Sequence, residues 1–213
     1  MPTLLRIESS PLPGDASFSR QLTHEFVERW RDTHPGARVI TRDLNSTGIP
    51  AIGAEWIGAV HTPEANLTAR QQEVLSLSNE LIAELHAADE YVFGVPMHNF
   101  GVPSVLKLWI DQIVRAGKTF TYENGARTSL LNNKKATVLI ASGGVYEQGT
   151  PTAALNFVEP YLRTVFGFVG VTDVNFINVA GVARLMSGVG RETILQPALE
   201  SVRALFEGSL QPA

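Results

Sequence analysis

Hydrophobic residues along the chain follow two alternating patterns, one typical of strands and one typical of helices. Short apolar runs bounded by turn residues predict five strands, at 4–8, 38–41, 91–95, 136–140 and from 175. Between them, apolar residues at three- and four-residue spacing predict helices over about 19–34, 68–85, 103–115, 157–168 and 192–206. The run at 91–95 is apolar throughout, which predicts a strand buried on both faces.

The alternation of strands with helices predicts an α/β fold, in which an open parallel sheet carries helices on both faces. No linker, charge block or internal repeat divides the sequence, so we expect one domain over residues 1–213. The segment 43–66 lacks a clear period and is expected to be irregular. Thr68 and Gln71 have the spacing of a capping box, which predicts that a helix begins directly after it.

Ligands of such sheets bind outside the carboxyl ends of the strands, so the loops after strands one, three and four are the places to search. The first of these loops, 9–19, leads into a helix and contains Ser10, Ser17 and Ser19. The free amides and the positive dipole end of a helix amino terminus suit a phosphate group. The same serines could instead only cap the helix.

The second loop, 96–103, contains Met97, His98, Asn99 and Phe100 between two prolines. This composition suits a rigid, partly apolar wall that packs against a flat ring. It is equally compatible with an ordinary strand–helix turn whose phenylalanine lies in the core.

The third loop, 142–146, contains Gly143 and Gly144, and paired glycines let the backbone approach a ligand closely. Alone, such a pair can also be a plain turn. Together, the three loops predict a phosphate site, a flat wall and a close backbone edge. That combination fits a mononucleotide with a planar head, which means FMN rather than ATP. The sequence contains no Gly-x-Gly-x-x-Gly, and Gly117-Lys118-Thr119 has Gln112 where a Walker element requires its first glycine, so neither a Rossmann dinucleotide fold nor a P-loop is indicated.

Composition narrows the remaining classes of function. The chain has no cysteine, its net charge is −4, and its five histidines share no ligand spacing. We therefore expect no thiolate chemistry, no nucleic-acid partner and no metal site. No apolar run approaches the ~20 residues that span a bilayer, and the amino terminus lacks a secretory pattern, so we expect a cytoplasmic protein without membrane contact.

Several segments together resemble the FMN-dependent NADH azoreductases, relatives of flavodoxin and of NAD(P)H:quinone reductases. The segments that carry this resemblance span nearly the whole chain and are 9–10, 17–19, 96–100, 115–120, 123–125, 142–144, 160–162, 167–170 and 172–174. The resemblance implies a flavodoxin-like three-layer sandwich whose five parallel strands have the order 2-1-3-4-5. It also implies FMN as the cofactor, NADH or NADPH as the electron donor, and quinones or azo compounds as acceptors.

The same resemblance assigns roles to particular residues. Those implied to hold the FMN phosphate are Ser10, Ser17, Phe18 and Ser19. Those implied to line the isoalloxazine ring are Met97, His98, Asn99, Phe100, Ser142, Gly143, Gly144 and Val145. The family commonly has a tyrosine where His98 stands, and its glycine loop is often one residue longer with an arginine.

A homodimer is also implied, and the helix predicted over 103–115 agrees with it, because this helix is apolar nearly all round. Such a helix is either deeply buried or has one face against a partner. Tyr122 and Phe168 are then candidates to cover the flavin or to shape the substrate pocket.

In this reading the cofactor carries the redox chemistry and the protein orients it. Donor and acceptor would use one slot in turn, which predicts ping-pong kinetics without a side-chain nucleophile. Tyr146 could donate a proton or hydrogen bond near the flavin pyrimidine edge, or it could lie at the surface. His98 is the other candidate catalytic side chain, because histidine as a residue type can exchange a proton near neutral pH, or it could simply face solvent.

Three alternatives stay open from the sequence. A quinone reductase with incidental azo activity would have the same residues. A flavodoxin-type electron carrier would lack a substrate pocket of its own, and the long segments 43–66 and 118–133 argue against it because they could wall such a pocket. A signalling receiver domain would need an acidic cluster at the carboxyl end of strand one, and Glu8 with its serine neighbours does not supply one.

Overall fold

A computed structural model describes residues 1–207 and shows a five-stranded sheet in which all neighbouring strands are parallel. The strands lie in the order β2-β1-β3-β6-β7. Their bounds are β1 Thr3–Glu8, β2 Arg38–Asp43, β3 Glu90–Pro96, β6 Lys135–Ala141 and β7 Asp173–Val179. The predicted fold and strand order are confirmed. The predicted single domain ends with residues 208–213, which lie outside the described part of the chain.

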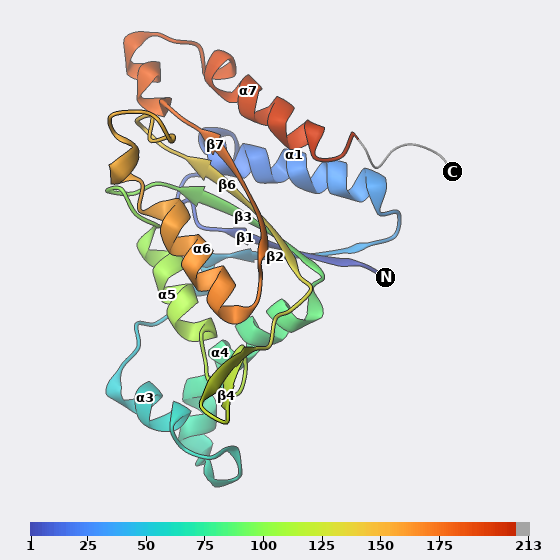
Figure 1. The fold of residues 1–213 in the computed structure, drawn as a ribbon, viewed down its shortest axis with the longest axis vertical. Coiled ribbons are helices and arrows are strands. Elements are labelled where there is room, and N and C mark those ends of the chain that lie inside the picture. Colours follow the sequence, from blue (N-terminus) through green and yellow to red (C-terminus); the bar gives the residue numbers. More distant parts are fainter. Residues whose placement is uncertain (208–213) are drawn as a thin grey trace.

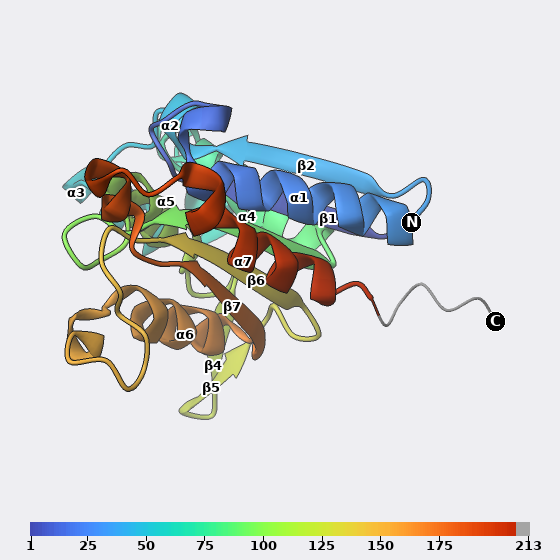
Figure 2. The same cartoon turned by 90° about the horizontal axis from the view of Figure 1, so that it is seen from above.

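Helices cover both faces of this sheet and make three layers (Figures 1 and 2). On one face lie α1 (Phe18–Thr33) and α7 (Arg191–Ala204), which contact each other. On the other face lie α4 (Ala69–Ala87), α5 (Ser104–Ile113) and α6 (Val158–Val169). These helices differ from the predicted ones only at their ends. Thr68 and Gln71 form the predicted capping box at the start of α4.

Alternate side chains of the central strands pack into two separate hydrophobic cores, one on each face of the sheet. In β3, Tyr91, Phe93 and Val95 pack toward α4, α5 and α6, while Val92 packs toward α1 and α7. All four are fully or almost fully buried. The uninterrupted apolar run of β3 therefore reflects burial on both faces, as predicted.

The expectation of an irregular segment over 43–66 is wrong. This stretch contains α2 (Leu44–Thr47), α3 (Ala54–Val60) and a 3₁₀ turn at Glu64–Asn66. The Asp43 side chain caps α2, and the indole of Trp56 donates to Gln112 Oε1 of α5 at 2.8 Å. These elements are short and half-exposed, so they depend on tertiary contacts and produce little hydrophobic period.

The segment 118–133 forms an antiparallel hairpin of β4 (Phe120–Glu123) and β5 (Ala126–Ser129). Asn124 and Gly125 make its turn, both with positive φ, as tight hairpins require. Three further 3₁₀ turns lie at Gly14–Ala16, Ala153–Leu155 and Val182–Ser187. Among the residues that the structure describes, no helix has the length and apolar character needed to cross a bilayer.

Gly94 stands in the middle of β3 because the side chain of Glu8 needs its space. The two residues are paired in register on neighbouring strands. A Cβ atom at position 94 would lie 2.6 Å from Glu8 Oε2 and 3.0 Å from Thr23 Cγ2. Both contacts are closer than van der Waals packing allows, so the buried carboxylate determines the glycine.

We predict that Gly94→Ala lowers the free energy of unfolding by roughly 1–3 kcal/mol, as overpacking of a well-filled core does. Urea unfolding measures the change. Gly58→Ala is the matched control, because Gly58 lies in α3 with no atom within 4 Å of its added Cβ. It should raise the free energy by up to about 1 kcal/mol, as alanine replaces glycine in a helix. Equal stability of Gly94→Ala and wild type would contradict the packing explanation.

Candidate functional site

A crevice of about 300 Å³ lies at the carboxyl edge of the sheet, where the loops after β1, β3, β6 and β7 meet. Its lining residues are Ser10, Leu12, Ala16, Ser17, Phe18, Ser19, Pro96, Met97, His98, Ala141, Ser142, Gly143, Val182, Leu185 and Arg191. The size lies at the lower end of the range typical of small-molecule sites. The three loops selected from the sequence therefore converge on one cavity, together with a fourth.

Three serine hydroxyls cluster where α1 begins. Ser17 Oγ donates to Ser10 Oγ at 2.8 Å and lies 3.2 Å from Ser19 Oγ. Ser17 is also the N-cap, since its Oγ accepts from the Arg20 amide at 3.3 Å. Ser17 therefore caps the helix, and all three serines line the cavity. The amides of the first helical turn have no intrahelical acceptor, so this corner is suited to an anion.

The loop that holds Ser10 is fixed from outside by the segment 43–66. The Ser10 carbonyl accepts from Arg20 Nη2 at 2.6 Å and from Asn45 Nδ2 at 2.8 Å. Arg20 is held in turn by Asp43 at 2.7 Å. The short helix α2 therefore positions the serine cluster.

The second loop is a tight turn with two strained residues. His98 and Gly101 exchange both backbone hydrogen bonds at 3.0 Å, and Asn99 and Phe100 between them have φ of 48° and 70°. Asparagine tolerates positive φ, whereas phenylalanine rarely adopts it. The Phe100 carbonyl also accepts from the Phe157 amide. Such strain is typical of functional sites, where the surrounding contacts maintain it.

The Phe100 ring is 44 % exposed, so the alternative of a core phenylalanine is excluded. Its ring lies edge-to-face against Tyr146, with centroids 6.0 Å apart. The third loop passes close to Tyr146, because a Cβ on Gly144 would lie 2.8 Å from that ring. Tyr146 is half-buried, whereas His98 is exposed on the turn and lines the crevice.

The third loop is held to the start of the β7–α7 connection. Ser142 donates to the Val179 carbonyl at 2.9 Å, and the amides of Val182 and Ala183 donate to Ser142 and Gly143. The Ser142 hydroxyl closes the loop on Gly144 at 2.9 Å. This bonding fixes the glycine backbone against the cavity, while the Val145 side chain projects outward.

Comparison with known proteins agrees with this arrangement. A family model described as flavodoxin-like fold matches residues 2–205. The FMN-dependent NADH:quinone oxidoreductase of Acidobacterium capsulatum is 51 % identical over 95 % of this chain and 98 % of its own. The chain belongs to the flavodoxin-like family of FMN-dependent NADH:quinone oxidoreductases. A second relative with that name, enzyme 3 from Burkholderia lata, is 46 % identical over 95 % of this chain and 98 % of its own.

Solved structures place the azoreductases in the same group. The azoreductase of Bacillus anthracis str. Sterne superposes with a TM-score of 0.87 and 27 % identity, over 98 % of this chain and all of that one. The predicted membership of the azoreductase family is thereby confirmed.

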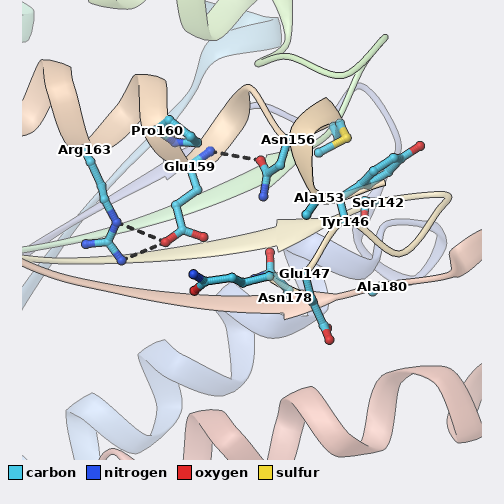
Figure 3. A pocket seen from close by; sticks show the side chains of 12 residues that line it. Ser142, Tyr146, Glu147, Ala153, Asn156, Glu159, Pro160, Arg163, Asn178 and Ala180 are labelled. Atoms are coloured by element: carbon cyan, nitrogen blue, oxygen red, sulfur yellow. Dashed lines mark hydrogen bonds and ion pairs between the residues drawn. The ribbon is translucent and has the colours of Figure 1, made fainter. Parts of the chain in front are cut away.

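A second cavity of about 380 Å³ lies beside the crevice and shares Met97 and Ser142 with it. Figure 3 shows its wall on α6, where Asn156 accepts from the Glu159 amide and Glu159 pairs with Arg163 at 2.7 Å. Larger volume does not make it the better cofactor site, because no helix N-terminus with clustered hydroxyls opens into it. Because the two cavities share Met97 and Ser142, the second cavity extends the crevice sideways.

Tyr122 and Phe168 lie away from both cavities. Phe168 is in the last turn of α6, and its ring lies 4.7 Å from Phe120 of the hairpin, which also contacts Tyr122. Arg127 stacks on Phe168 and donates to its carbonyl. The two candidates are therefore close together but are not brought to the crevice within one chain.

The loop after β7 was not anticipated as part of the site. Val182, Leu185 and Arg191 line the crevice from this connection. A local signal existed, because Gly190-Arg191 precedes an amphipathic helix at the end of a parallel strand, just as the serines do. No cluster of three potential metal-ligating side chains occurs within residues 1–207.

A buried carboxylate lies directly below the serines. Glu8 is 1 % exposed and accepts from Arg6 Nε at 2.6 Å and from Thr23 Oγ1 at 2.5 Å. Burial raises its pKa above the ordinary 4.5, although Arg6, Thr23 and Arg20 oppose the shift. Its second oxygen, Oε2, has no hydrogen-bond partner among the described residues.

We predict that Glu8→Gln gains stability relative to wild type as pH rises. Between 4.5 and the raised folded-state pKa, the unfolded chain has lost the Glu8 proton and the folded chain still holds it. The free energy of unfolding of the wild type therefore falls with pH in that window, and the variant lacks this loss. Urea unfolding from about pH 3 to pH 8 measures the difference.

Glu25→Gln provides the control of opposite sign. A hydrogen bond from Arg203 lowers the pKa of Glu25, so the wild type should gain stability over this variant as pH rises toward 4.5. A difference between Glu8→Gln and wild type that stays constant with pH would contradict the raised pKa.

Proposed function

We propose that this chain works as one domain over residues 1–213 that binds FMN in the crevice and uses NADH to reduce quinones and azo compounds. The observation that carries the proposal is the serine cluster at the start of α1, facing a rigid turn and a fixed glycine backbone across one cavity. The names of the Acidobacterium, Burkholderia and Bacillus relatives supply the cofactor, the donor and the acceptor classes.

The residues present fit FMN at both ends of the cofactor. Ser10, Ser17 and Ser19 offer hydroxyl donors, and the first turn of α1 offers amides, which together suit a phosphate. Phe18 shares this corner. The strained turn and the Gly143–Gly144 backbone would border the planar ring, with Met97 and Ser142 between the two cavities.

When bound, FMN supplies the capacity to accept and donate hydride. The protein's own contribution is orientation, exclusion of water and hydrogen bonding. The backbone at Asn99, Phe100 and Gly143 is fixed by hairpin and loop bonds, so it needs no rearrangement when a ligand arrives. Tyr146, half-buried on the wall of the second cavity, is the side chain that we propose gives a hydrogen bond or proton to the ring edge. His98 is exposed and would act only at the rim.

An apolar rim at the mouth supports flat, conjugated acceptors. This rim consists of Phe100 and Val145, which have large exposed fractions, and of Tyr146, which contacts the Phe100 ring and lines the second cavity. We propose that nicotinamide and acceptor use this rim in turn, because both are planar and the crevice has one such face. Shared use means that the first product leaves before the second substrate binds, which gives ping-pong kinetics.

The first test is a visible spectrum of the purified protein with anaerobic NADH. We expect a yellow protein that releases FMN and bleaches with NADH alone. Colour should return on addition of a quinone or azo dye. Initial-rate plots at several acceptor concentrations should give parallel lines in double-reciprocal form. A protein that stays colourless with excess FMN would contradict the proposal, and intersecting lines would contradict only the shared slot.

The alternative function is a flavodoxin-type electron carrier without its own substrate pocket. Such a protein would bind FMN but would not bleach with NADH unless a reductase were added. The second cavity, which Asn156 and Tyr146 border, favours an enzyme over an electron carrier. An electron carrier needs no space for a substrate beside its flavin ring.

We also propose a homodimer in which a second copy brings Tyr122 and Phe168 to the crevice. Within one chain they lie elsewhere, so only a partner can place them there. An apolar groove of about 560 Å³ between α5 and α6 supports an interface, and Phe157 at its edge is 59 % exposed. On α5 itself, Leu106, Trp109 and Ile110 are buried, so its inner face is already covered.

Sedimentation equilibrium tests the dimer. We expect a species of twice 23.1 kDa for wild type and a shift toward monomer for Phe157→Glu, because a charge in an apolar interface loses its hydration. Leu205→Glu, an exposed apolar residue outside the groove, is the control and should remain dimeric. A monomeric wild type at micromolar concentration would contradict the assembly.

A further inference from the structure

Arg191 reaches into the crevice from the far end of the chain. It is the first residue of α7, and its guanidinium carbon lies 3.9 Å from the centroid of the Phe18 ring. Both Phe18 and Arg191 line the crevice together with the three serines. The side chain thus stands over the residue that follows the N-cap of α1.

Two nitrogens of the Arg191 guanidinium have no acceptor in the part of the chain that the structure describes. Its Nε and Nη2 are buried without a hydrogen-bond partner within residues 1–207. Stacking on Phe18 compensates part of the lost hydration, since an aromatic face attracts a cation. It cannot satisfy N–H donors that lie in the plane of the guanidinium. Buried, unpaired donors of a charged group are costly, so an acceptor is expected in the same space.

The surroundings of Arg191 favour a negatively charged acceptor. The amino termini of α1 and α7 both open at this crevice, and each carries a positive dipole end. Gly190, the N-cap of α7, offers no side-chain acceptor to the free amides of that helix. The hydroxyls of Ser10, Ser17 and Ser19 add further hydrogen-bond donors to the same crevice. The geometry suits a phosphate, whose planar oxygen pairs match the fork of a guanidinium.

We infer that Arg191 recognises the FMN phosphate and is the residue by which this protein distinguishes FMN from riboflavin. This role rests on the proposed function. It adds a contact from α7 to those that the serines of the first loop would make with the phosphate. Riboflavin has the same ring and lacks the phosphate, so it would leave Arg191 without its partner. A purely structural Arg191, held only by Phe18, would affect both flavins alike.

The test compares two flavins on the apoprotein. Quenching of flavin fluorescence gives Kd for FMN and for riboflavin with wild type, Arg191→Gln and Arg191→Lys. We expect Arg191→Gln to weaken FMN binding by about 10- to 100-fold, the usual range for one charged hydrogen-bonding contact. Riboflavin binding should change by less than about twofold. Arg191→Lys keeps the charge without the fork and should be intermediate.

Arg203→Gln is the matched control, because it removes the same charge from the same helix. Arg203 lies in the last turn of α7 and forms an ion pair with Glu25 of α1. It does not line the crevice. It should leave both dissociation constants near the wild-type values. Circular dichroism of each variant verifies that the fold is retained, and Arg191→Lys serves if Arg191→Gln does not fold.

Unchanged FMN binding in Arg191→Gln would overturn the inference, and so would an equal loss of FMN and riboflavin affinity. Either result leaves the proposed function intact, provided that wild type binds FMN. A wild type that binds neither flavin would overturn the proposed function itself. A selective loss of FMN affinity is the outcome that supports the role of Arg191.

Discussion

The parallel direction of all five strands is the constraint on which this molecule depends. It sends every strand's carboxyl end, and the helix start that follows it, to one edge of the sheet. Four of these connections meet at the crevice, and the first turns of α1 and α7 present amides without an intrahelical acceptor there. The cap at Ser17 alone would not create a ligand site. The topology itself concentrates donors, and the serines at α1 and the glycines after β6 adapt that edge to a ligand.

A polar network beneath the edge links the site to the core. Glu8 joins Arg6 and Thr23 inside the layer between the sheet and α1, and Gly94 leaves room for it. Ser9, the next residue, donates to the Gly94 carbonyl at 2.7 Å. The start of the loop after β1 is therefore set by a buried ionic group and by the backbone of the neighbouring strand. Placement of the loop thus depends on a carboxyl group whose pKa is raised by its own burial.

Much of this could be predicted from the sequence, because the information was local. The period of β3, the cap at Ser17 and the capping box at Thr68 each involve neighbouring residues. What escaped prediction depends on distant partners. Asn45 gains its role only from contact with Ser10, and Arg191 only from contact with Phe18. The hairpin β4–β5 was missed because its short strands are mostly exposed and have no apolar alternation.

The closeness of Phe18 and Arg191 also bears on how the protein is made. Translation delivers the amino end first, so a nascent chain has its serines long before β7 and α7 emerge. Until then the crevice lacks the wall formed by Val182 and Leu185. A flavin that met the chain during synthesis would lack the contacts made by Val182, Leu185 and Arg191. A cofactor stabilises only the state that it binds, so it would add little stability at that stage. The growing chain must therefore rely on its own hydrophobic contacts until the last helix leaves the ribosome.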